Sequence, residues 1–278
     1  MMRIAVAVEY DGTAYAGWQT QQSARSVQQV AEAAFSSIAA EPLNLICAGR
    51  TDSGVHARWQ VAHFDTHASR RLRAWLLGAN SELPRDVSVS WVRPVPAHFH
   101  ARYSAEARTY RYVILNRGSR SALAANRAAC IFHPLDHLRM AEAAAALCGL
   151  HDFSAFRSAQ CQAHSPIRRM EKLTVERHGD WVLIEATANA YLHHMMRNIA
   201  GLLIDIGKGA APAGWAREVL EGRDRKRNAA TAPAHGLYLW DVRYPAAFGL
   251  PAPPEDDAFG SGCPTPGWPA HRSAIIRT

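Results

Sequence analysis

Several features are missing from this chain of 278 residues, and each absence argues against a class of function. No apolar run reaches the roughly 20 residues that a membrane-spanning helix needs. The first segment, MMRIAVAVEY, reaches charged residues too soon for a signal peptide. Neither the phosphate loop G-x-x-x-x-G-K-S/T nor the fingerprint G-x-G-x-x-G occurs, so we expect no nucleotide cofactor. These absences predict a soluble protein that contacts no membrane.

Cysteine is rare and scattered along the chain. The five cysteines are odd in number and form no C-x-x-C pair. They are Cys47, Cys130, Cys148, Cys161 and Cys263. This usage argues against a disulfide framework or a zinc knuckle, and it favours reduced thiols in a cytoplasmic protein.

Histidine is common, with fourteen residues, but its spacing does not predict a metal site. His98 and His100 would share one face of a strand, and no nearby acidic residues complete a ligand set. His193 and His194 are adjacent in a predicted helix, where neighbouring side chains do not face the same way. We therefore expect no metal and no cofactor.

The hydrophobic pattern of the first half predicts the order β-α-β-β-α-β. We predict strands at 3–10, 43–48, 59–65 and 86–92, and helices at 26–40 and near 72–76. Ser26 is the expected cap of the first helix. This order is typical of a ferredoxin-like unit.

The second half repeats the same order. We predict strands at 108–115, 170–177, 181–187 and 236–244, and helices at 136–148, 191–206 and 214–220. The repeat indicates an α+β fold of two fused ferredoxin-like (RRM-like) units, with antiparallel sheets backed by helices. Two such sheets facing each other would enclose a central basic RNA-binding cleft.

Composition divides the chain into three parts. We expect an N-terminal unit over 1–105, a C-terminal unit over 106–244 and a tail over 245–278. The tail holds 7 of the 15 prolines and has no hydrophobic period, so we expect it to be flexible, with little defined structure.

The segment AGRTDSGVHA, residues 48–57, combines turn residues with reactive ones. Glycine, threonine, aspartate and serine are ordinary turn residues. A turn, however, needs no arginine beside its aspartate. Two interpretations remain open. Arg50 and Asp52 could form a local ion pair on a surface turn, or the loop could present Asp52 as a catalytic carboxylate.

The net charge of +7 favours a polyanionic partner. The segment FHARYSAEARTYRY interleaves Arg102, Arg108 and Arg111 with aromatic residues. Arginine can bind phosphate while aromatic rings stack on bases. Tyr110 and Tyr112 would share one face of a strand, with Arg111 on the other. A half-buried strand with both tyrosines in the core fits this pattern equally well.

The predicted helix at 191–206 carries an arginine within an apolar stretch. Leu192, Met195, Met196 and Ile199 would pack inward, which leaves Arg197 at the edge of the buried face. Arginine stays charged in proteins. Arg197 therefore either meets a carboxylate or phosphate there, or extends from the shoulder of the helix to solvent.

The order of the motifs resembles one known family along residues 3–244. The matching segments are EYDGTAYAGWQ, SVQ, AGRTDSGVHA, FHARYSA, RTYRY, HDFSAF, HHMMRNI and GLYL. Together they are similar to the tRNA pseudouridine synthase A family, and AGRTDSGVHA is highly specific for it.

The resemblance implies a function and a set of residue roles. Members isomerise uridine to pseudouridine at positions 38, 39 and 40 of the tRNA anticodon stem-loop, as cytoplasmic homodimers without cofactor or metal. The catalytic aspartate maps onto Asp52, and substrate-binding residues map onto Tyr110 and Arg197. Tyr110 would stack on the uracil and assist loss of the C5 proton. Whether Asp52 attacks C1′ or removes a proton from C2′ stays open. Expected tRNA contacts are Arg50, Phe99, His100, Ala101, Arg102, Tyr103, Arg157, Gln160 and Cys161.

Overall fold

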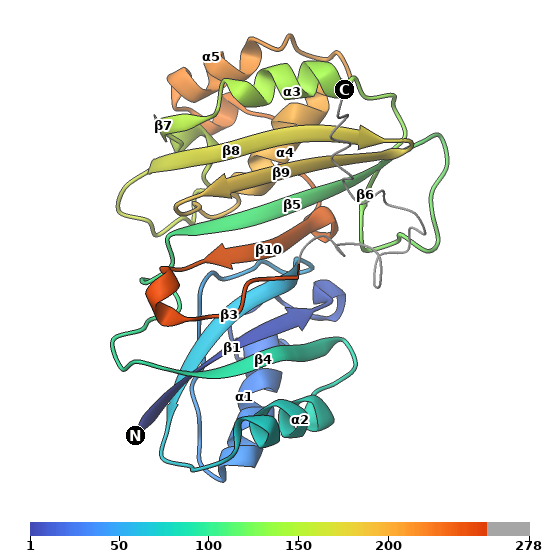
Figure 1. Ribbon diagram of the computed structural model, residues 1–278. Helices are drawn as coiled ribbons and strands as arrows, with labels where there is room; N and C mark the ends of the chain where they lie inside the picture. The colour runs from blue at the N-terminus through green and yellow to red at the C-terminus, as the bar shows by residue number, and fades with distance from the viewer. Residues whose placement is uncertain (255–278) are drawn as a thin grey trace, which may run out of the picture.

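The computed structural model describes residues 1–254 and shows a mixed α+β fold built on one sheet (Figure 1). Within these residues the sheet has ten strands, in the order β4-β1-β3-β10-β5-β9-β8-β7, with β2 paired to β3 and β6 to β5. The N-terminal strands are β1 (Met2–Tyr10), β2 (Ile46–Cys47), β3 (His56–Thr66) and β4 (Val87–Val95). The C-terminal strands are β5 (Ala107–Asn116), β6 (Ala129–Ile131), β7 (Gly149–Asp152), β8 (Ile167–His178), β9 (Trp181–Ala188) and β10 (Leu237–Arg243).

Within the described residues, five α-helices back this sheet in two groups (Figure 1). Helices α1 (Val27–Ala39) and α2 (Leu72–Glu82) lie with the N-terminal strands. Helices α3 (His137–Ala145), α4 (Met195–Gly207) and α5 (Trp215–Gly222) lie with the C-terminal strands. Among the residues 1–254, no helix combines the length and apolar character that crossing a membrane requires.

Local capping explains where two of these helices begin. The Ser26 hydroxyl accepts a hydrogen bond from the Gln29 N–H at the start of α1, as expected. The Asp136 carboxylate accepts from the N–H groups of Leu138 and Arg139 at the start of α3. Each cap satisfies donors that the first turn of a helix leaves unpaired.

The strands of the two halves join in one sheet, so the expectation of two facing sheets is wrong. Strands β3 and β10 pair in parallel, with Tyr238 opposite His56 and Leu239 opposite Ala57. This pairing satisfies backbone groups that would otherwise remain open at the edge of each half. The junction lies directly after the loop at residues 48–55, which is therefore held at the border of the two halves.

The predicted helix at 191–206 begins four residues later than expected, at Met195. His194 stands before it with φ of 63°, a left-handed conformation that cannot continue a right-handed helix. Apolar periodicity marks the buried face of a helix but does not report such a backbone reversal. The displaced start determines where His193 and His194 point.

The described part of the tail has more structure than expected. Residues Ala246–Phe248 form a short 3-10 helix. The Phe248 ring packs edge-on against Phe99, with 5.0 Å between ring centroids. The rest of the predicted tail, residues 255–278, lies outside the described residues.

Candidate active site

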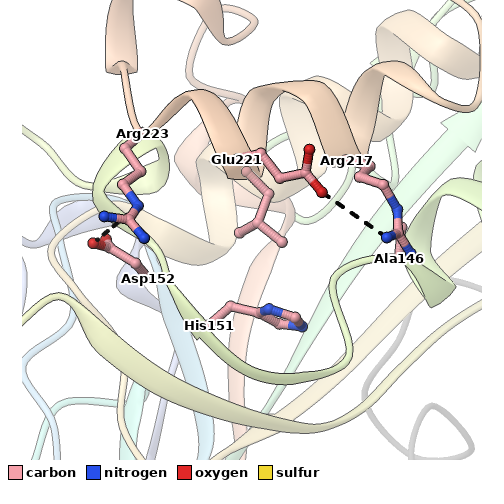
Figure 2. A pocket seen from close by; sticks show the side chains of 7 residues that line it. Ala146, His151, Asp152, Arg217, Glu221 and Arg223 are labelled. Carbon is pink, nitrogen blue, oxygen red and sulfur yellow. Dashed lines mark ion pairs between the residues drawn. The ribbon is translucent and has the colours of Figure 1, made fainter.

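A small hollow lies between α5 and β7 in the C-terminal half (Figure 2). Its volume is about 140 Å³, which is small for a site that must enclose a nucleotide. Ion pairs between Arg223 and Asp152 (3.5 Å) and between Arg217 and Glu221 (3.9 Å) partly occupy its walls. The residues predicted from the sequence as catalytic or substrate-binding are not among those that line it.

The loop that carries Asp52 is packed tightly against the segment that follows β1. A Cβ atom on Gly12 would lie 2.0 Å from the Val55 carbonyl oxygen, and one on Gly17 would lie 2.4 Å from that of Thr51. Gly17 also has φ of 91°, a conformation that other residues rarely adopt. These close approaches explain why the motif EYDGTAYAGWQ needs its glycines beside AGRTDSGVHA.

Side chains from strands β1 and β3 also form hydrogen bonds with the loop. The Tyr10 hydroxyl lies 2.7 Å from the Thr51 hydroxyl. The Gln60 amide donates to the Gly49 carbonyl, with 2.5 Å between the atoms. Both partners, Tyr10 and Gln60, are buried strand residues. The loop is therefore anchored to strands β1 and β3 through the residues just before Asp52.

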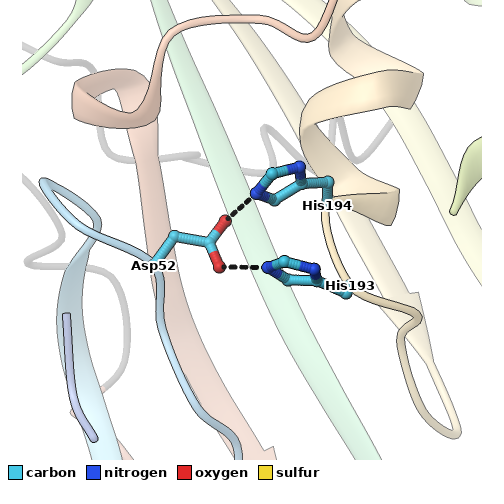
Figure 3. Close-up of side chains that lie close together, drawn as sticks. All are labelled: Asp52, His193 and His194. Atoms are coloured by element: carbon cyan, nitrogen blue, oxygen red, sulfur yellow. Dashed lines mark ion pairs between the residues drawn. The ribbon is translucent and has the colours of Figure 1, made fainter. Parts of the chain in front are cut away.

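The Asp52 carboxylate faces side chains from the segment just before α4 and from its first turn (Figure 3). Arg197 donates a hydrogen bond from Nη1 to Oδ2 at 3.0 Å. The Nε2 atom of His193 lies 3.3 Å from Oδ1, and that of His194 lies 3.3 Å from Oδ2. The Asp52 side chain keeps 23% of its surface exposed. Three groups that can bear positive charge thus surround a carboxylate that solvent and ligands can still reach.

Sequence reasoning did not identify the two histidines, because it placed both in a helix. The left-handed backbone at His194 changes the direction of the chain between them, and both side chains then point toward Asp52 (Figure 3). Their rings lie 4.0 Å apart, centroid to centroid. The adjacency in HHMMRNI was visible in the sequence, but the convergence on Asp52 was not.

Asp52, His193 and His194 also form a group that could hold a metal ion. Their ligand atoms lie within 4.8 Å of one another, and two imidazoles with a carboxylate are ligands that zinc accepts. Arg197, however, already donates to the Asp52 oxygen that lies beside His194. A metal would have to share that oxygen with the fixed positive charge of Arg197, so the arrangement fits a set of side chains that hold the carboxylate better than it fits a metal site.

Tyr110 lies on β5 next to the loop, with only 8% of its surface exposed. Its ring meets the Tyr191 ring edge-on, with 4.7 Å between centroids. Burial raises the pKa of the Tyr110 hydroxyl well above its usual value, Arg108 opposes that rise and the Asp52 charge adds to it. The hydroxyl therefore stays protonated at neutral pH.

The residues expected to contact tRNA divide into accessible and buried ones. Arg50, Arg102, Tyr103 and Gln160 are exposed, and His100, Arg157 and Cys161 are partly buried. The side chains of Phe99 and Ala101 are fully buried, so in this structure they are not at the surface, and their contact with tRNA stays a prediction. Phe99 packs instead against Tyr244 and Phe248.

Arg108 is a buried connector rather than a phosphate contact. Its guanidinium donates to backbone carbonyls from both halves of the chain. The acceptors are Ala48 (3.0 Å), Arg102 (2.5 Å), Ala105 (3.2 Å) and Asn189 (3.0 Å). Because Ala48 begins the Asp52 loop, Arg108 fixes the loop to the second half.

Arg111 is likewise engaged within the protein. Its Nε donates to the Glu185 carboxylate at 2.6 Å, and its guanidinium stacks on Trp240 at 4.1 Å from the ring centroid. Tyr112 on the opposite face is fully buried. For this strand the structure favours the interpretation with tyrosines in the core.

A second group of aspartate, histidine and arginine side chains lies at the other end of the loop. His56 is 3% exposed, and its Nδ1 lies 3.2 Å from Asp11. Its Nε2 faces the carbonyls of Asn126 (2.9 Å) and His235 (3.2 Å) and so carries a proton. Nδ1 accepts from the Gly12 N–H when unprotonated and donates to Asp11 when protonated.

Comparison with known proteins gives consistent matches. A family model described as tRNA pseudouridine synthase matches residues 6–104 and 143–245. Those ranges include Asp52, His193, His194 and Arg197, whereas Tyr110 lies between them. The chain is 51% identical over 249 residues to tRNA pseudouridine synthase A of Legionella pneumophila (strain Lens), covering 90% of this chain and 95% of the relative. It is 54% identical to that of Methylococcus capsulatus (strain Bath), covering 90% and 92%. The corresponding Pseudomonas aeruginosa protein is 51% identical over 263 residues, covering 94% and 92%.

Proposed function

This chain belongs to the tRNA pseudouridine synthase family of isomerases, and we propose that it converts uridine to pseudouridine at positions 38, 39 and 40 of the tRNA anticodon stem-loop. In this proposal Asp52 is the catalytic residue and no cofactor takes part. The observation that carries it is the accessible Asp52 carboxylate, held by Arg197 across the border of the two halves.

The isomerisation fits a site built around one ionised carboxylate. The reaction breaks the bond between C1′ and N1 and forms one between C1′ and C5. A proton leaves C5 and N1 gains one, so the step needs neither an oxidant nor water. Asp52 either attacks C1′ or removes the proton from C2′, and both roles require the charged form. The guanidinium of Arg197 donates a hydrogen bond to this carboxylate at 3.0 Å and so holds it in place.

Tyr110 has a narrower role in this proposal than the sequence suggested. Because burial raises the pKa of its hydroxyl, Tyr110 is a poor base at neutral pH. We assign it to stacking on the uracil and to hydrogen-bond donation. The target uridine must leave its stem to reach this buried ring, as it does in enzymes that extrude a base.

The remaining expectations extend the proposal to the whole chain. The order β4-β1-β3 with β2 beside β3, and the order β10-β5-β9-β8, are equivalent in the two halves. This equivalence supports two fused ferredoxin-like units over 1–105 and 106–244. Two exposed arginines, Arg50 and Arg102, support a basic cleft for tRNA. Both lie close enough to the buried Cys47, just before the loop, for their charges to oppose the rise of the Cys47 thiol pKa to about 12 that burial causes.

We further propose a homodimer in the cytoplasm, as the resemblance implies. Sedimentation of the full chain would show a mass near twice 30.5 kDa. A monomer that retains activity would contradict the dimer without affecting the chemistry.

Tritium release from tRNA that carries 5-tritiated uridine tests the reaction directly. The wild-type chain should release tritium after EDTA treatment, and Asp52→Asn should not. Three substrates, each with a single uridine at position 38, 39 or 40, would then test the sites one at a time. Release by Asp52→Asn at the wild-type rate would exclude Asp52 as the catalytic residue. Release only from uridines outside the anticodon stem-loop would exclude the proposed positions.

A further inference from the structure

His193 and His194 each contact one oxygen of the Asp52 carboxylate (Figure 3). We propose that they are positioning residues, which fix the rotation of the Asp52 carboxylate so that one lone pair faces the ribose. This inference rests on the proposed function, because it concerns the efficiency of Asp52. It assigns a role to two side chains that neither the sequence motifs nor the comparisons explain.

The contacts around Asp52 are arranged asymmetrically. Among the described residues, Oδ2 lies near two groups, Arg197 at 3.0 Å and His194 at 3.3 Å, whereas Oδ1 lies near one, His193 at 3.3 Å. Arg197 on its own would hold one oxygen and leave the carboxylate plane free to turn. A second contact on the opposite oxygen defines that plane. Catalysis by a positioned group depends on its orientation as well as its distance.

The backbone is specialised to deliver both imidazoles. His194 has φ of 63°, one of few non-glycine residues with positive φ among the described residues. His194 immediately precedes α4 and Arg197 lies in its first turn, and both side chains lie near the same carboxylate oxygen, Oδ2. The left-handed residue then directs the preceding side chain, His193, toward the same carboxylate. A strained conformation at a functional group suggests that the strain serves the function.

Hydrogen bonds hold this reversal in place. The His193 carbonyl accepts from the Ser158 N–H at 2.9 Å, and the His194 carbonyl accepts from the Asn198 N–H at 2.9 Å. Both backbone positions are therefore fixed independently of the imidazoles. Substitutions at these two positions can change the side chains without removing the anchors.

The decisive variant is His194→Gly. Glycine adopts the left-handed conformation without strain, so the melting temperature should stay equal or rise. The imidazole contact is lost, so kcat should fall about 10- to 100-fold while KM for tRNA stays within about threefold. Substitution of a residue with only a structural role would not lower kcat while stability is maintained.

Ala40→Gly is the matched control, because Ala40 has φ of 59° and follows the last residue of α1. It should gain stability in the same way with unchanged kcat.

Conservative variants complete the test. Asparagine tolerates the left-handed conformation and has an N–H donor, so kcat of His194→Asn should lie between those of His194→Gly and the wild type. His193→Ala should lower kcat, and His193→Gln should restore part of it. Wild-type kcat in both His194→Gly and His193→Ala would overturn the proposal, provided that Asp52→Asn is inactive. If Asp52→Asn is itself active, the proposed function fails first.

A chelation experiment distinguishes a positioning role of the two histidines from a role as metal ligands. EDTA-treated wild-type protein should keep its kcat, because the imidazoles act on Asp52 directly. Loss of activity on chelation, with recovery on adding Zn²⁺, would overturn the proposal and assign the three side chains to a metal.

Discussion

The two ends of one loop carry two groups of similar composition but opposite character. Asp11 accepts from both the N–H and the hydroxyl of Thr13, at 3.0 and 2.5 Å. Asp52 is held by the side chains of His193, His194 and Arg197 from the other half of the chain. Asp11 also contacts the side chains of His56 and Arg127, but its donors from Thr13 make it the cap of a short 3-10 helix. Among the described residues, Asp52 has side-chain partners and no such capping role.

Burial of the histidines follows the same division. The His56 side chain is 3% exposed, and its ring stacks on Tyr238 with 4.6 Å between centroids. The side chains of His193 and His194 are 37% and 29% exposed. Residue type therefore does not distinguish the two groups. The exposure of their histidines does, and so do the donors from Thr13 that cap Asp11.

The sharpest test of this contrast is Asp52→Asn against Asp11→Asn. Loss of the Asp52 charge should reduce kcat at least about 10⁴-fold, as removal of a catalytic group does in other enzymes. Its melting temperature should change little, because the side chain is partly exposed. Asp11→Asn should keep kcat within about threefold. Tritium release and thermal unfolding on both variants would measure this, and equal activity loss in both would contradict the division.

Arg197→Met should have the next largest effect. The substitution removes the hydrogen bond to Asp52 at 3.0 Å and the one from Nε to the Ala232 carbonyl at 2.9 Å. We expect kcat to fall about 10²- to 10³-fold, which is typical for loss of one donor to a reacting group. Arg127→Met is the counterpart at Asp11, where the partners lie 3.3 Å apart and Arg127 is 45% exposed. Unchanged kcat in Arg197→Met would separate Arg197 from catalysis.

The sequence predicted most elements because their signals are local. Hydrophobic periodicity predicted strands that correspond to β1, β8 and β9, and the capping residue Ser26 predicted the start of α1. The joining of the halves by β3 and β10 is long-range pairing, which no local pattern encodes. The expectation of two facing sheets failed for that reason.

The site was partly predictable for a similar reason. Asp52 and Arg197 belong to specific motifs, so the resemblance named them before their contact was known. His193 and His194 were missed because a left-handed residue interrupts an apparently helical segment. Arg108 and Arg111 were considered as phosphate contacts because sequence does not reveal which arginines are buried with carbonyl or carboxylate partners.

Arg108→Met should destabilise the fold by about 2–4 kcal/mol. It leaves buried carbonyls without donors, including Ala48 at the start of the Asp52 loop. Urea unfolding would measure the loss. Arg243→Met is the control, because Arg243 is 50% exposed and its pair with Glu171 is a surface contact worth at most about 1 kcal/mol. Equal effects in the two variants would show that Arg108 does not connect the halves.

Asp11→Asn should have the smallest effect, about 1 kcal/mol of stability at pH 7. The hydrogen bond with His56, followed by those from Thr13, lowers the pKa of Asp11 below its ordinary 3.8, although burial opposes this. A carboxyl with a lowered folded-state pKa stabilises the fold above its unfolded-state pKa, and that contribution disappears as the pH falls toward the folded-state value. The stability difference between wild type and Asp11→Asn should therefore be constant from pH 7 to about pH 5 and shrink below about pH 4. Urea unfolding at pH 7, 5 and 3 would measure it. A difference that grows in acid would mean that Asp11 is not the stabilising cap that distinguishes this group from Asp52.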